Sequence, residues 1–349
     1  MYSREIQEGR PSPVENGIPL QGTWTQAFSE VDLYNIQRPY SIPMPAWIKD
    51  SRIKEWESFI IDDERFIILA RLCNLKYCHN AYVMMYNKET GERQEFRKLI
   101  PGRGWRLPRS LNNGSVNSRS LGFFFRIHSW LDANSITMEL DIKRTLRRPA
   151  LTAHVTFDLD AGKTVPMAVS LLFSDRRSMY AYKAMTAVYG DMVSGGRHIH
   201  LDSKKTSGLF CDYKGYYPYR MRTFWCTGLG FDNQNRRFGF ALGENQAREP
   251  FKNNENALWI DGRLTTLPPV KITRSGGADS EWIIQDMEGM VDLVFTPKAP
   301  GRKLDEFIIY SSEYENPLGH FNGIMVSSEG EEIPVRNFSG ICEKLYLRV

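Results

Sequence analysis

Apolar and polar side chains alternate along much of this chain. Residues 136–143 (ITMELDIK) and 151–160 (LTAHVTFDLD) change strictly between the two kinds at every position. A period of two places successive side chains on opposite faces of a β-strand, so one face packs on a core and the other meets water. The pattern therefore predicts antiparallel strands with one solvated face.

Turn signals separate these strands. Short polar segments that contain a glycine lie between apolar stretches at Lys88–Gly91, Asp261–Gly262 and Glu329–Gly330. An Asp-Gly pair tolerates the positive φ angles of a two-residue hairpin turn, which favours a hairpin at that position. Strands recur roughly every 8–12 residues, a spacing typical of sandwiches and barrels. We therefore predict an all-β fold built from antiparallel sheets.

Helical signals are scarce. Thr25–Ile36 is the best helix candidate, because Trp24, Phe28 and Val31 fall near helical spacing. The segment Arg176–Tyr189 is ambiguous between helix and strand. Strand patterns dominate elsewhere, so we expect helices to contribute little to the fold.

Prolines interrupt the first fifty residues and prevent a continuous element there, which predicts an arm packed on the body. A chain of 349 residues is long enough for two β domains. The weakest patterning near its middle is SGGRHIH at residues 194–200. We predict an N-terminal arm at residues 1–50, a first β domain at 51–195 and a second β domain at 196–349, each a barrel or a sandwich.

The composition is that of an ordinary globular protein, with 42% hydrophobic and 25% charged residues. The net charge is +4 and the basic residues are dispersed, which disfavours a nucleic-acid partner. No apolar run approaches the length of a membrane span, about 18 residues. Residues 1–17 are polar and lack the apolar core of a signal peptide. We expect a cytoplasmic protein with no integral membrane segment.

The cysteines and histidines predict neither a disulfide framework nor a metal centre. The five cysteines are odd in number and none forms a CxxC pair, which favours reduced thiols. His198, His200 and Asp202 share one strand face and have ligand chemistry, but two histidines on a solvated face are commoner. The sequence holds no Walker A, GxSxG or HExxH motif. We expect no metal and no cofactor.

The densest group of aromatic residues surrounds one acid. Asp212 lies in the segment 209–225 among aromatic residues, including Phe210, Tyr213, Tyr216, Tyr217, Tyr219 and Trp225. Such a group predicts a pocket for a lipophilic or planar small molecule. A carboxyl group buried in it has a raised pKa and can act as a general acid near neutral pH. Asp212 also fits the first position of a turn that ends at Gly215, so both roles stay open.

Lys183 and Glu255 are further ionisable groups near aromatic residues. Lys183 follows two tyrosines in MYAYK and is free to pair with Asp212 or with Glu255. A pair with Asp212 would lower the pKa of that carboxyl group and prevent it from acting as an acid. A structural ion pair is the favoured role of Lys183. Glu255 and Asn256 precede a hairpin, where they either bind a ligand or cap the strand entry.

Six segments carry a longer pattern in a consistent order, and together they span nearly the whole chain. They are NGIPLQGTWTQAFSEVDLYN (16–35), RIKEWESFII (52–61), MYAYKAMTAVYGDM (179–192), DYKGYYPYRMRTFW (212–225), NENALWIDG (254–262) and the segment Leu318–Glu343. This set resembles the domain-of-unknown-function family 2804. The second segment resembles that family's Lys-x-Trp-acid-aromatic strand. Here Glu57 stands where Asp is more frequent, and Ser58 displaces the second aromatic residue.

A more distant resemblance lies in the Tyr–Gly–Asp–Trp order across residues 180–225. This order is similar to that of the carotenoid hydratase and lipocalin-like hydrolase families, which implies paired calycin-type β domains. The resemblance implies that Asp212 protonates or orients an apolar substrate, with Tyr180 and Trp225 nearby. The flanking Trp-x-Asp-His pattern of those families is absent, because Phe210 and Tyr213 stand at its positions.

The fold expected from these observations is all-β, with two calycin-like or lipocalin-like antiparallel domains and an N-terminal arm. The first hypothesis for function is cofactor-free, acid-assisted hydration, cyclisation or isomerisation of a lipophilic or planar small molecule. One alternative is a carrier or sensor of such a molecule. The other is a carbohydrate-active protein, in which Asp212 and Glu255 would face each other. The expected catalytic residues are Asp212, Tyr180 and Lys183, and the expected ligand-binding residues are Trp56, Tyr217, Trp225, Glu255 and Asn256.

Overall fold

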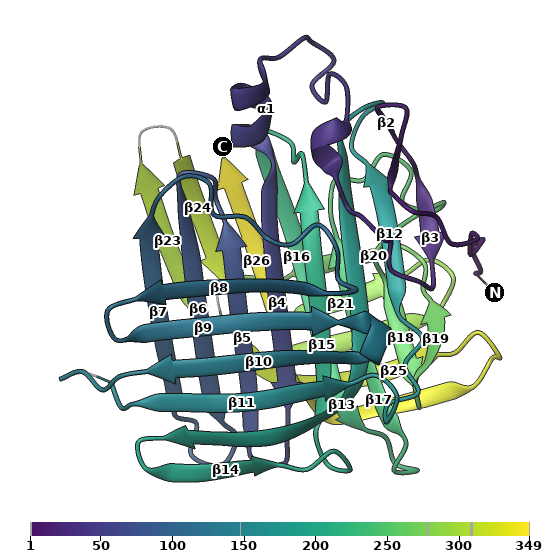
Figure 1. Ribbon diagram of the computed structural model, residues 1–349. Coiled ribbons are helices and arrows are strands. Elements are labelled where there is room, and N and C mark those ends of the chain that lie inside the picture. The colour runs from purple at the N-terminus through teal and green to yellow at the C-terminus, as the bar shows by residue number, and fades with distance from the viewer. Residues whose placement is uncertain (1, 147, 278, 308–309, 349) are drawn as a thin grey trace.

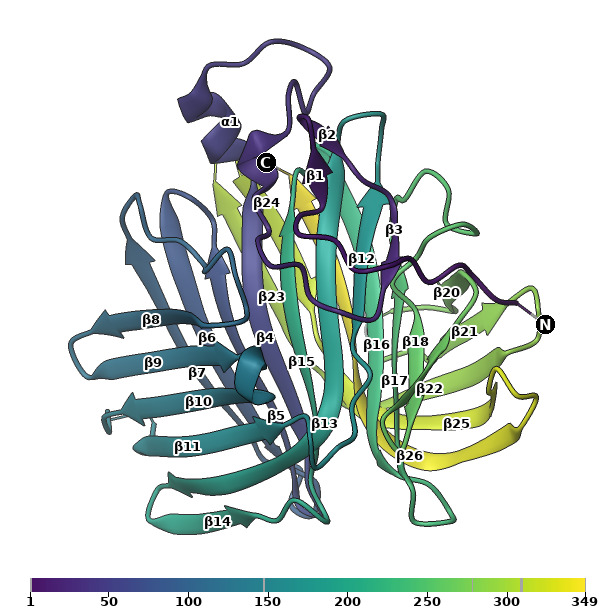
Figure 2. The same cartoon turned by 45° about the vertical axis from the view of Figure 1, so that its right-hand side comes forward.

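The computed structural model describes residues 2–146, 148–277, 279–307 and 310–348. Within these residues the strands form two large antiparallel sheets and one small pair of strands, and the helices are short. Figure 1 shows the first sheet curling, and Figure 2 shows most of the first sheet at the left and most of the second at the right. This architecture confirms the predicted all-β fold with two calycin-like antiparallel units.

The first sheet contains β3 (Gly22–Trp24), β4 (Lys54–Asp62), β5 (Phe66–Asn74), β6 (Cys78–Asn87), β7 (Arg93–Pro101), β8 (Gly114–Ser120), β9 (Phe123–Trp130), β10 (Ser135–Ile142), β11 (Leu151–Asp158), β12 (Met167–Leu172), β13 (Ser178–Ser194), β14 (Arg197–Leu201) and β15 (Ser207–Gly215). Its strand order is β7-β6-β5-β4-β15-β13-β11-β10-β9-β8. β12 and β14 pair with β13, and β3 pairs with β12. In Figure 1, β8–β11 cross in front of β4–β7, so the sheet folds over on itself.

The second sheet contains β16 (Arg220–Phe231), β17 (Arg237–Glu244), β18 (Ala257–Ile260), β19 (Arg263–Thr266), β20 (Val270–Arg274), β21 (Trp282–Asp286), β22 (Val291–Ala299), β23 (Arg302–Phe307), β24 (Tyr310–Glu315), β25 (Leu318–Val326) and β26 (Glu332–Arg348). Its order is β19-β18-β17-β16-β26-β25-β22-β21-β20, and β24 joins β23 to β26. The predicted turn between β18 and β19 has φ angles of 46° at Asp261 and 79° at Gly262. These positive values confirm the two-residue hairpin.

The arm holds β1 (Val14–Glu15), β2 (Ile18–Pro19), the 3-10 turn η1 (Leu33–Asn35) and the helix α1 (Ala46–Arg52), while a second 3-10 turn, η2 (Leu131–Ala133), follows β9. The helix expected at Thr25–Ile36 is wrong, because η1 is the helical structure that forms there. The Asp32 side chain accepts a hydrogen bond from the backbone N–H of Tyr34 at 3.0 Å. This bond starts a tight turn, and such side-chain bonds compete with a continuous helix.

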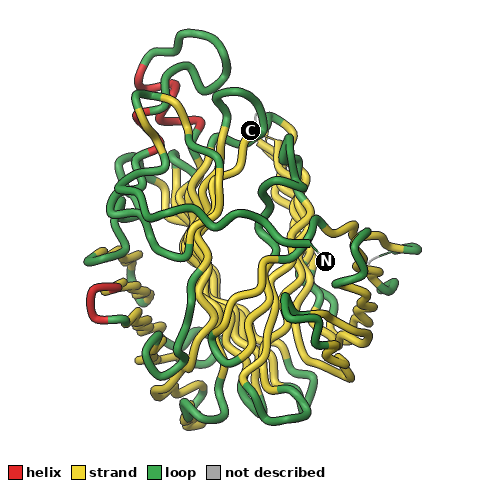
Figure 3. Tube along the Cα trace, turned by 90° about the vertical axis from the view of Figure 1, so that its right-hand side faces the viewer, coloured by secondary structure: helices red, strands yellow, loops and turns green. Residues whose placement is uncertain are grey.

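Alternation along the strands divides the buried apolar residues into three clusters among the described residues. One cluster lies inside the curl of the first sheet and another inside the second sheet. The remaining cluster lies between the sheets, which run on either side of the middle of the molecule in Figure 3. On β15, Phe210 faces the inside of the first sheet, whereas Leu209 and Tyr213 face the second sheet.

The chain passes from the first sheet to the second between β15 and β16, across residues 216–219. Arg4 of the arm donates hydrogen bonds to the carbonyl oxygens of Asn254 and Asn256, which lie just before β18. The arm therefore contacts both sheets, through β3 in the first and through Arg4 in the second. The domain boundary between residues 195 and 196 stays a prediction.

Candidate functional site

The strands β13, β15, β4 and β5 place a row of side chains on the face that looks toward the second sheet. Register sets Lys183 opposite Cys211, Cys211 opposite Ser58, and Ser58 opposite Arg71. The row runs across the strands, because directly opposed residues on neighbouring strands project to the same face. Three strand spacings separate Lys183 from Arg71, or about 14 Å between their backbones.

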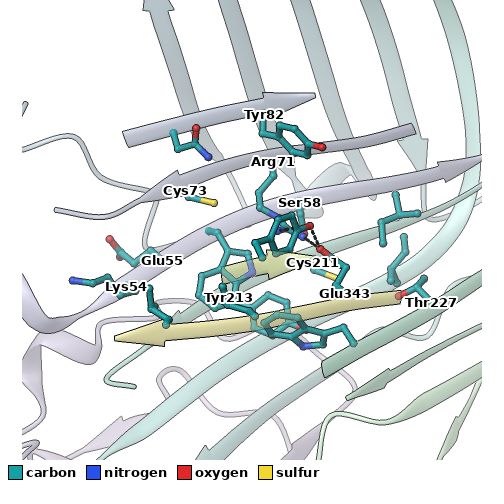
Figure 4. A pocket seen from close by; sticks show the side chains of 18 of the residues that line it. Lys54, Glu55, Ser58, Arg71, Cys73, Tyr82, Cys211, Tyr213, Thr227 and Glu343 are labelled. Carbon is teal, nitrogen blue, oxygen red and sulfur yellow. Dashed lines mark hydrogen bonds and ion pairs between the residues drawn. The ribbon is translucent and has the colours of Figure 1, made fainter. Parts of the chain in front are cut away.

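A cavity of about 150 Å³ lies over this row, between the two sheets. Figure 4 shows its side chains, with Lys54 and Glu55 at one end and Thr227 toward the other. The first sheet contributes Trp56 and Tyr213 next to the row, and the second sheet contributes Trp225 and Glu343. Since Trp225 and Glu343 are directly opposed on β16 and β26, they form one patch of the facing wall.

Aromatic rings make one side of the cavity. The rings of Trp56 and Tyr213 are stacked, with centroids 4.9 Å apart and planes at 22°. The ring of Trp225 stands edge-on to both, at 6.1 Å from each. Tyr217 stacks on Trp56 at 5.4 Å and supports that ring. Stacked and edge-on ring pairs at these distances are favourable aromatic geometry, so the rings form a well-packed aromatic wall beside the cavity.

A buried ion pair joins the two sheets near this aromatic wall. Nζ of Lys183 lies 3.0 Å from Oε2 of Glu255 and donates to the Glu255 carbonyl oxygen at 2.8 Å. Glu255 also accepts hydrogen bonds from the Tyr213 hydroxyl at 2.7 Å, the Trp225 indole at 3.3 Å and the Asn245 amide at 2.8 Å. Burial alone would raise the pKa of Glu255, but Lys183, Tyr213 and Asn245 outweigh it and lower the pKa. Glu255 is therefore an ionised, fully bonded carboxylate rather than an acid.

A second pair crosses between the sheets at Arg71. Its Nη2 lies 2.6 Å from Oε1 of Glu343, the pair joined by dashed lines in Figure 4. Its Nη1 donates to the Tyr314 hydroxyl at 3.2 Å, and that hydroxyl donates to Glu343. Burial, with Glu343 adding to it, raises the pKa of Tyr314 well above its usual value, although Arg71 opposes the rise. Tyr314 therefore keeps its proton and acts as a donor.

The opposite face of β4, β13 and β15 carries a different group of ionisable side chains. Asp212 is directly opposed to Glu57, and both are fully buried inside the first sheet. Lys214 pairs with Oδ2 of Asp212. Within the described residues, Oδ1 of Asp212, both carboxyl oxygens of Glu57 and the Tyr180 hydroxyl have no hydrogen-bond partner. We call Glu57, Asp212, Lys214 and Tyr180 the inner acid cluster.

Burial dominates the titration of this cluster. Burial, with the neighbouring Asp212 adding to it, raises the pKa of Glu57 to about 8, although Lys214 opposes the rise. Burial also raises the pKa of Asp212, although Lys214 opposes that rise. Because the pKa of Glu57 lies above neutrality, its protonated form predominates at pH 7.

The family model for the domain of unknown function DUF2804 matches residues 4–348. The chain belongs to the DUF2804 family. This result confirms the resemblance carried by the six sequence segments. The search of curated proteins finds no match to the chain.

Solved structures with a similar fold differ widely from this chain in sequence. The crystal structure of CghA with Sch210972 is 11% identical, covers 98% of this chain and 97% of its own, and has a TM-score of 0.51. The crystal structure of kievitone hydratase from Nectria haematococca is 13% identical, covers 84% of this chain and 88% of its own, and has a TM-score of 0.48. At these identities the likeness to CghA establishes a shared fold along nearly the whole chain.

The structure separates the expected site residues into two groups. Trp56, Lys183 and Trp225 line the inter-sheet cavity, with Glu255 bonded directly behind Lys183. Asp212 and Tyr180 lie together in the inner acid cluster, on the other face of the same strands. A pair of carboxyl groups that cleaves a carbohydrate must face each other across one pocket. Asp212 and Glu255 do not, because they lie on opposite sides of the first sheet.

Asn256 and Tyr217 have supporting positions. Oδ1 of Asn256 accepts from the backbone N–H of Gly243 at 2.6 Å, and its amide donates to the Pro268 carbonyl oxygen at 2.8 Å. These bonds hold the start of β18 beside β17. Tyr217 braces Trp56 from behind, and its hydroxyl has no hydrogen-bond partner in the described part of the chain.

Several residues that line the cavity were not predicted from the sequence. Arg71, Ser58 and Cys211 share the row with Lys183, and Glu343 and Tyr314 face them from the second sheet. The signal for Ser58 and Cys211 was the alternation around Trp56 and Tyr213, because residues two apart on a strand share a face. Arg71 and Glu343 lie 272 positions apart in the chain. Their contact depends on how the two sheets pack against each other, and local patterns in the sequence do not predict that packing.

The histidine stretch does not gather metal ligands. His200 on β14 lies 2.9 Å from Asp191 on β13, and both side chains are exposed. Among the residues that the structure describes, no group of three or more His, Cys, Asp or Glu side chains is arranged to hold a metal ion. In the same residues, no helix has the length and apolar character needed to cross a membrane.

Proposed function

We propose that this protein binds a planar, largely apolar small molecule in the inter-sheet cavity. The observation that carries the proposal is the wall of Trp56, Tyr213 and Trp225, whose rings lie 4.9–6.1 Å apart around the cavity. Concave sites with aromatic walls and a few polar anchors are the usual form of small-molecule sites. A cavity of about 150 Å³ accommodates a compact ring system.

The polar groups of the cavity suit orientation of a ligand. Lys183 and Arg71 are each paired with a carboxylate of the other sheet, so the ends of the polar row are electrically balanced. Ser58 and Cys211 lie between them and add small polar atoms to the floor. Burying an apolar ring over this row therefore leaves the charges of Lys183 and Arg71 compensated.

Acid-assisted hydration, cyclisation or isomerisation without a cofactor is a second candidate function. The observation that favours it is the inner acid cluster, where Glu57 holds a proton at neutral pH beside Asp212. Pairs of carboxyl groups with shifted pKa values are common where an enzyme needs an acid and a base. A substrate of this chemistry would have to enter the first sheet, because the cavity between the sheets lies on the opposite face of β15.

Ligand titrations of three tryptophan variants test the binding proposal. We expect Trp56→Leu and Trp225→Leu each to weaken the binding of a planar ring compound about tenfold or more, because each removes an aromatic contact with the ligand. Trp47→Leu is the matched control, since Trp47 lies on α1 and is 72% exposed. Isothermal titration calorimetry measures the affinity. Equal affinities in the three variants would refute a site at this wall.

Asp212→Asn separates binding from acid catalysis in the same titration. If the protein is a carrier, this variant should bind the ligand like the wild type, because Asp212 faces away from the cavity. If it is an enzyme acting through the inner acid cluster, Asp212→Asn should abolish turnover and leave affinity within about tenfold. Product analysis by mass spectrometry after incubation measures turnover.

A further inference from the structure

Several charged side chains around the inter-sheet cavity form ion pairs. Lys183 pairs with Glu255, and Arg71 pairs with Glu343. Glu55 pairs with Lys76, their charged atoms 2.7 Å apart. Lys54 also lines the cavity, and none of the ion pairs found among the described residues involves it, since the nearby Asp50 pairs with Lys76 and Arg106.

Lys54 is the first residue of β4 and stands at one end of the cavity beside Glu55 (Figure 4). Its side chain is buried and lines the cavity, and its Nζ donates to the carbonyl oxygen of Ser51 at 2.7 Å. An ammonium group has three donors, so a carbonyl oxygen satisfies one of them. A buried cation without a counter-charge is costly, and an anion supplied by a ligand would remove that cost.

The position of Lys54 relative to the aromatic wall indicates where that anion would lie. Lys54 and Trp56 are two residues apart on β4, so their side chains project from the same face about 6.6 Å apart. A ring that contacts Trp56 would therefore carry a substituent toward Lys54. The neighbouring residues Arg52 and Lys76 add positive charge near Lys54, and Asp50 adds negative charge.

We propose that the ligand of the inter-sheet cavity is a planar aromatic acid, whose ring lies against Trp56 and whose carboxylate pairs with Lys54. This inference rests on the proposed binding function and adds the charge and orientation of the ligand. The carboxylate would accept hydrogen bonds from the Lys54 ammonium hydrogens that are not bonded to the Ser51 carbonyl oxygen.

The titration of Lys54 provides a signature of such a pair. Burial, with Arg52 and Lys76 adding to it, lowers the pKa of Lys54 to about 7, while Asp50 and Cys78 oppose the shift. An anionic ligand favours the charged amine and raises this pKa. At pH 8 the free amine is mostly neutral, so binding of an acid should take up part of a proton from the solution, and binding of a neutral compound should not.

The test compares 2-naphthoate with its neutral analogue 2-naphthamide by isothermal titration calorimetry in two buffers of different ionisation enthalpy. In the wild type, we expect 2-naphthoate to bind at least about tenfold more tightly, the usual worth of a charge-assisted hydrogen bond. Its binding at pH 8 should also take up protons. Both differences should vanish in Lys54→Gln and in Lys54→Met, and Lys54→Arg should restore the preference for the acid.

Lys49→Gln is the matched control, because Lys49 is also bonded to a backbone carbonyl oxygen, that of Ile36, and does not line the cavity. It should keep the preference of the wild type. Equal affinities for 2-naphthoate and 2-naphthamide in the wild type would overturn the acid inference and leave the binding site standing. Failure of both compounds to bind would overturn the proposed function together with it.

Discussion

Glu57 has a carboxyl group that is fully buried, and neither oxygen has a hydrogen-bond partner among the described residues. Its nearest ionisable neighbour across the strand is Asp212, which repels a second negative charge. The protein tolerates Glu57 by keeping it protonated, because a neutral carboxyl group costs much less to bury than a carboxylate. Glu57 therefore couples the stability of the first sheet to pH.

Unfolding measured against pH tests this coupling. The pKa of Glu57 is raised to about 8 in the folded protein, against about 4.5 in an unfolded chain. Between these values the unfolded state releases the proton while the folded state keeps it, so stability falls as pH rises from about 5 to 8. Glu57→Gln should make this decline shallower by up to about 1.4 kcal/mol per pH unit. Urea unfolding measures it, with the turn variant Glu89→Gln as control, and an unchanged pH slope would contradict the assignment.

Asp212 is surrounded by aromatic residues in the sequence, and the structure shows which of them also surround it in space. In space the group divides, because Asp212 and Phe210 point into the first sheet while Tyr213 points into the inter-sheet cavity. Density along a strand mixes both faces, since successive side chains alternate. The sequence left Asp212 and Glu255 as candidate partners of Lys183. In the structure Lys183 pairs with Glu255, because Lys183 and Asp212 project from opposite faces of the first sheet.

The buried carboxylate of Glu255, just before β18, packs against Gly243 of β17. A Cβ atom at Gly243 would lie 2.8 Å from both Cδ and Oε1 of Glu255. That carboxylate has little freedom to move, since Lys183, Tyr213 and Asn245 all bind it. Gly243 thus leaves room on β17 for the inter-sheet ion pair.

Gly243→Ala should therefore destabilise the protein by about 1–3 kcal/mol, the usual cost of overfilling a packed interior. Thermal unfolding followed by circular dichroism measures the loss. Gly277→Ala is the control, because a Cβ atom there meets no atom within 4 Å. Equal melting temperatures for the two variants would show that Glu255 is not confined as described.

Elements with a strict period of two were predictable, and those that depend on contacts elsewhere were not. The patterns at 136–143 and 151–160 coincide with β10 and β11 except at their last one or two residues, and the Asp261–Gly262 turn has the expected positive φ angles. The ambiguous segment 176–189 becomes part of β13, because β15, β11 and β12 pair along it. Apart from η1, residues 25–36 remain irregular, since their apolar side chains are held against the first sheet rather than along a helix.

At the scale of the whole molecule, two curled sheets share an apolar interface that is crossed by the Lys183–Glu255 and Arg71–Glu343 pairs. The all-β class and the family were readable from the sequence. The cavity was not, because it depends on which strands of one sheet face which strands of the other. Placing Trp225 of β16 over Trp56 of β4 requires the path of the chain between β15 and β16, which carries no periodic signal.

The central claim is that a planar ligand binds between the sheets, against Trp56, Tyr213 and Trp225. A crystal structure of the protein with 2-naphthoate tests it most directly. We predict electron density for the ring system in contact with Trp56 and Trp225, with the carboxylate at the Lys54 end of the cavity. Density only inside the first sheet beside Glu57, or only on the outer surface, would contradict the account.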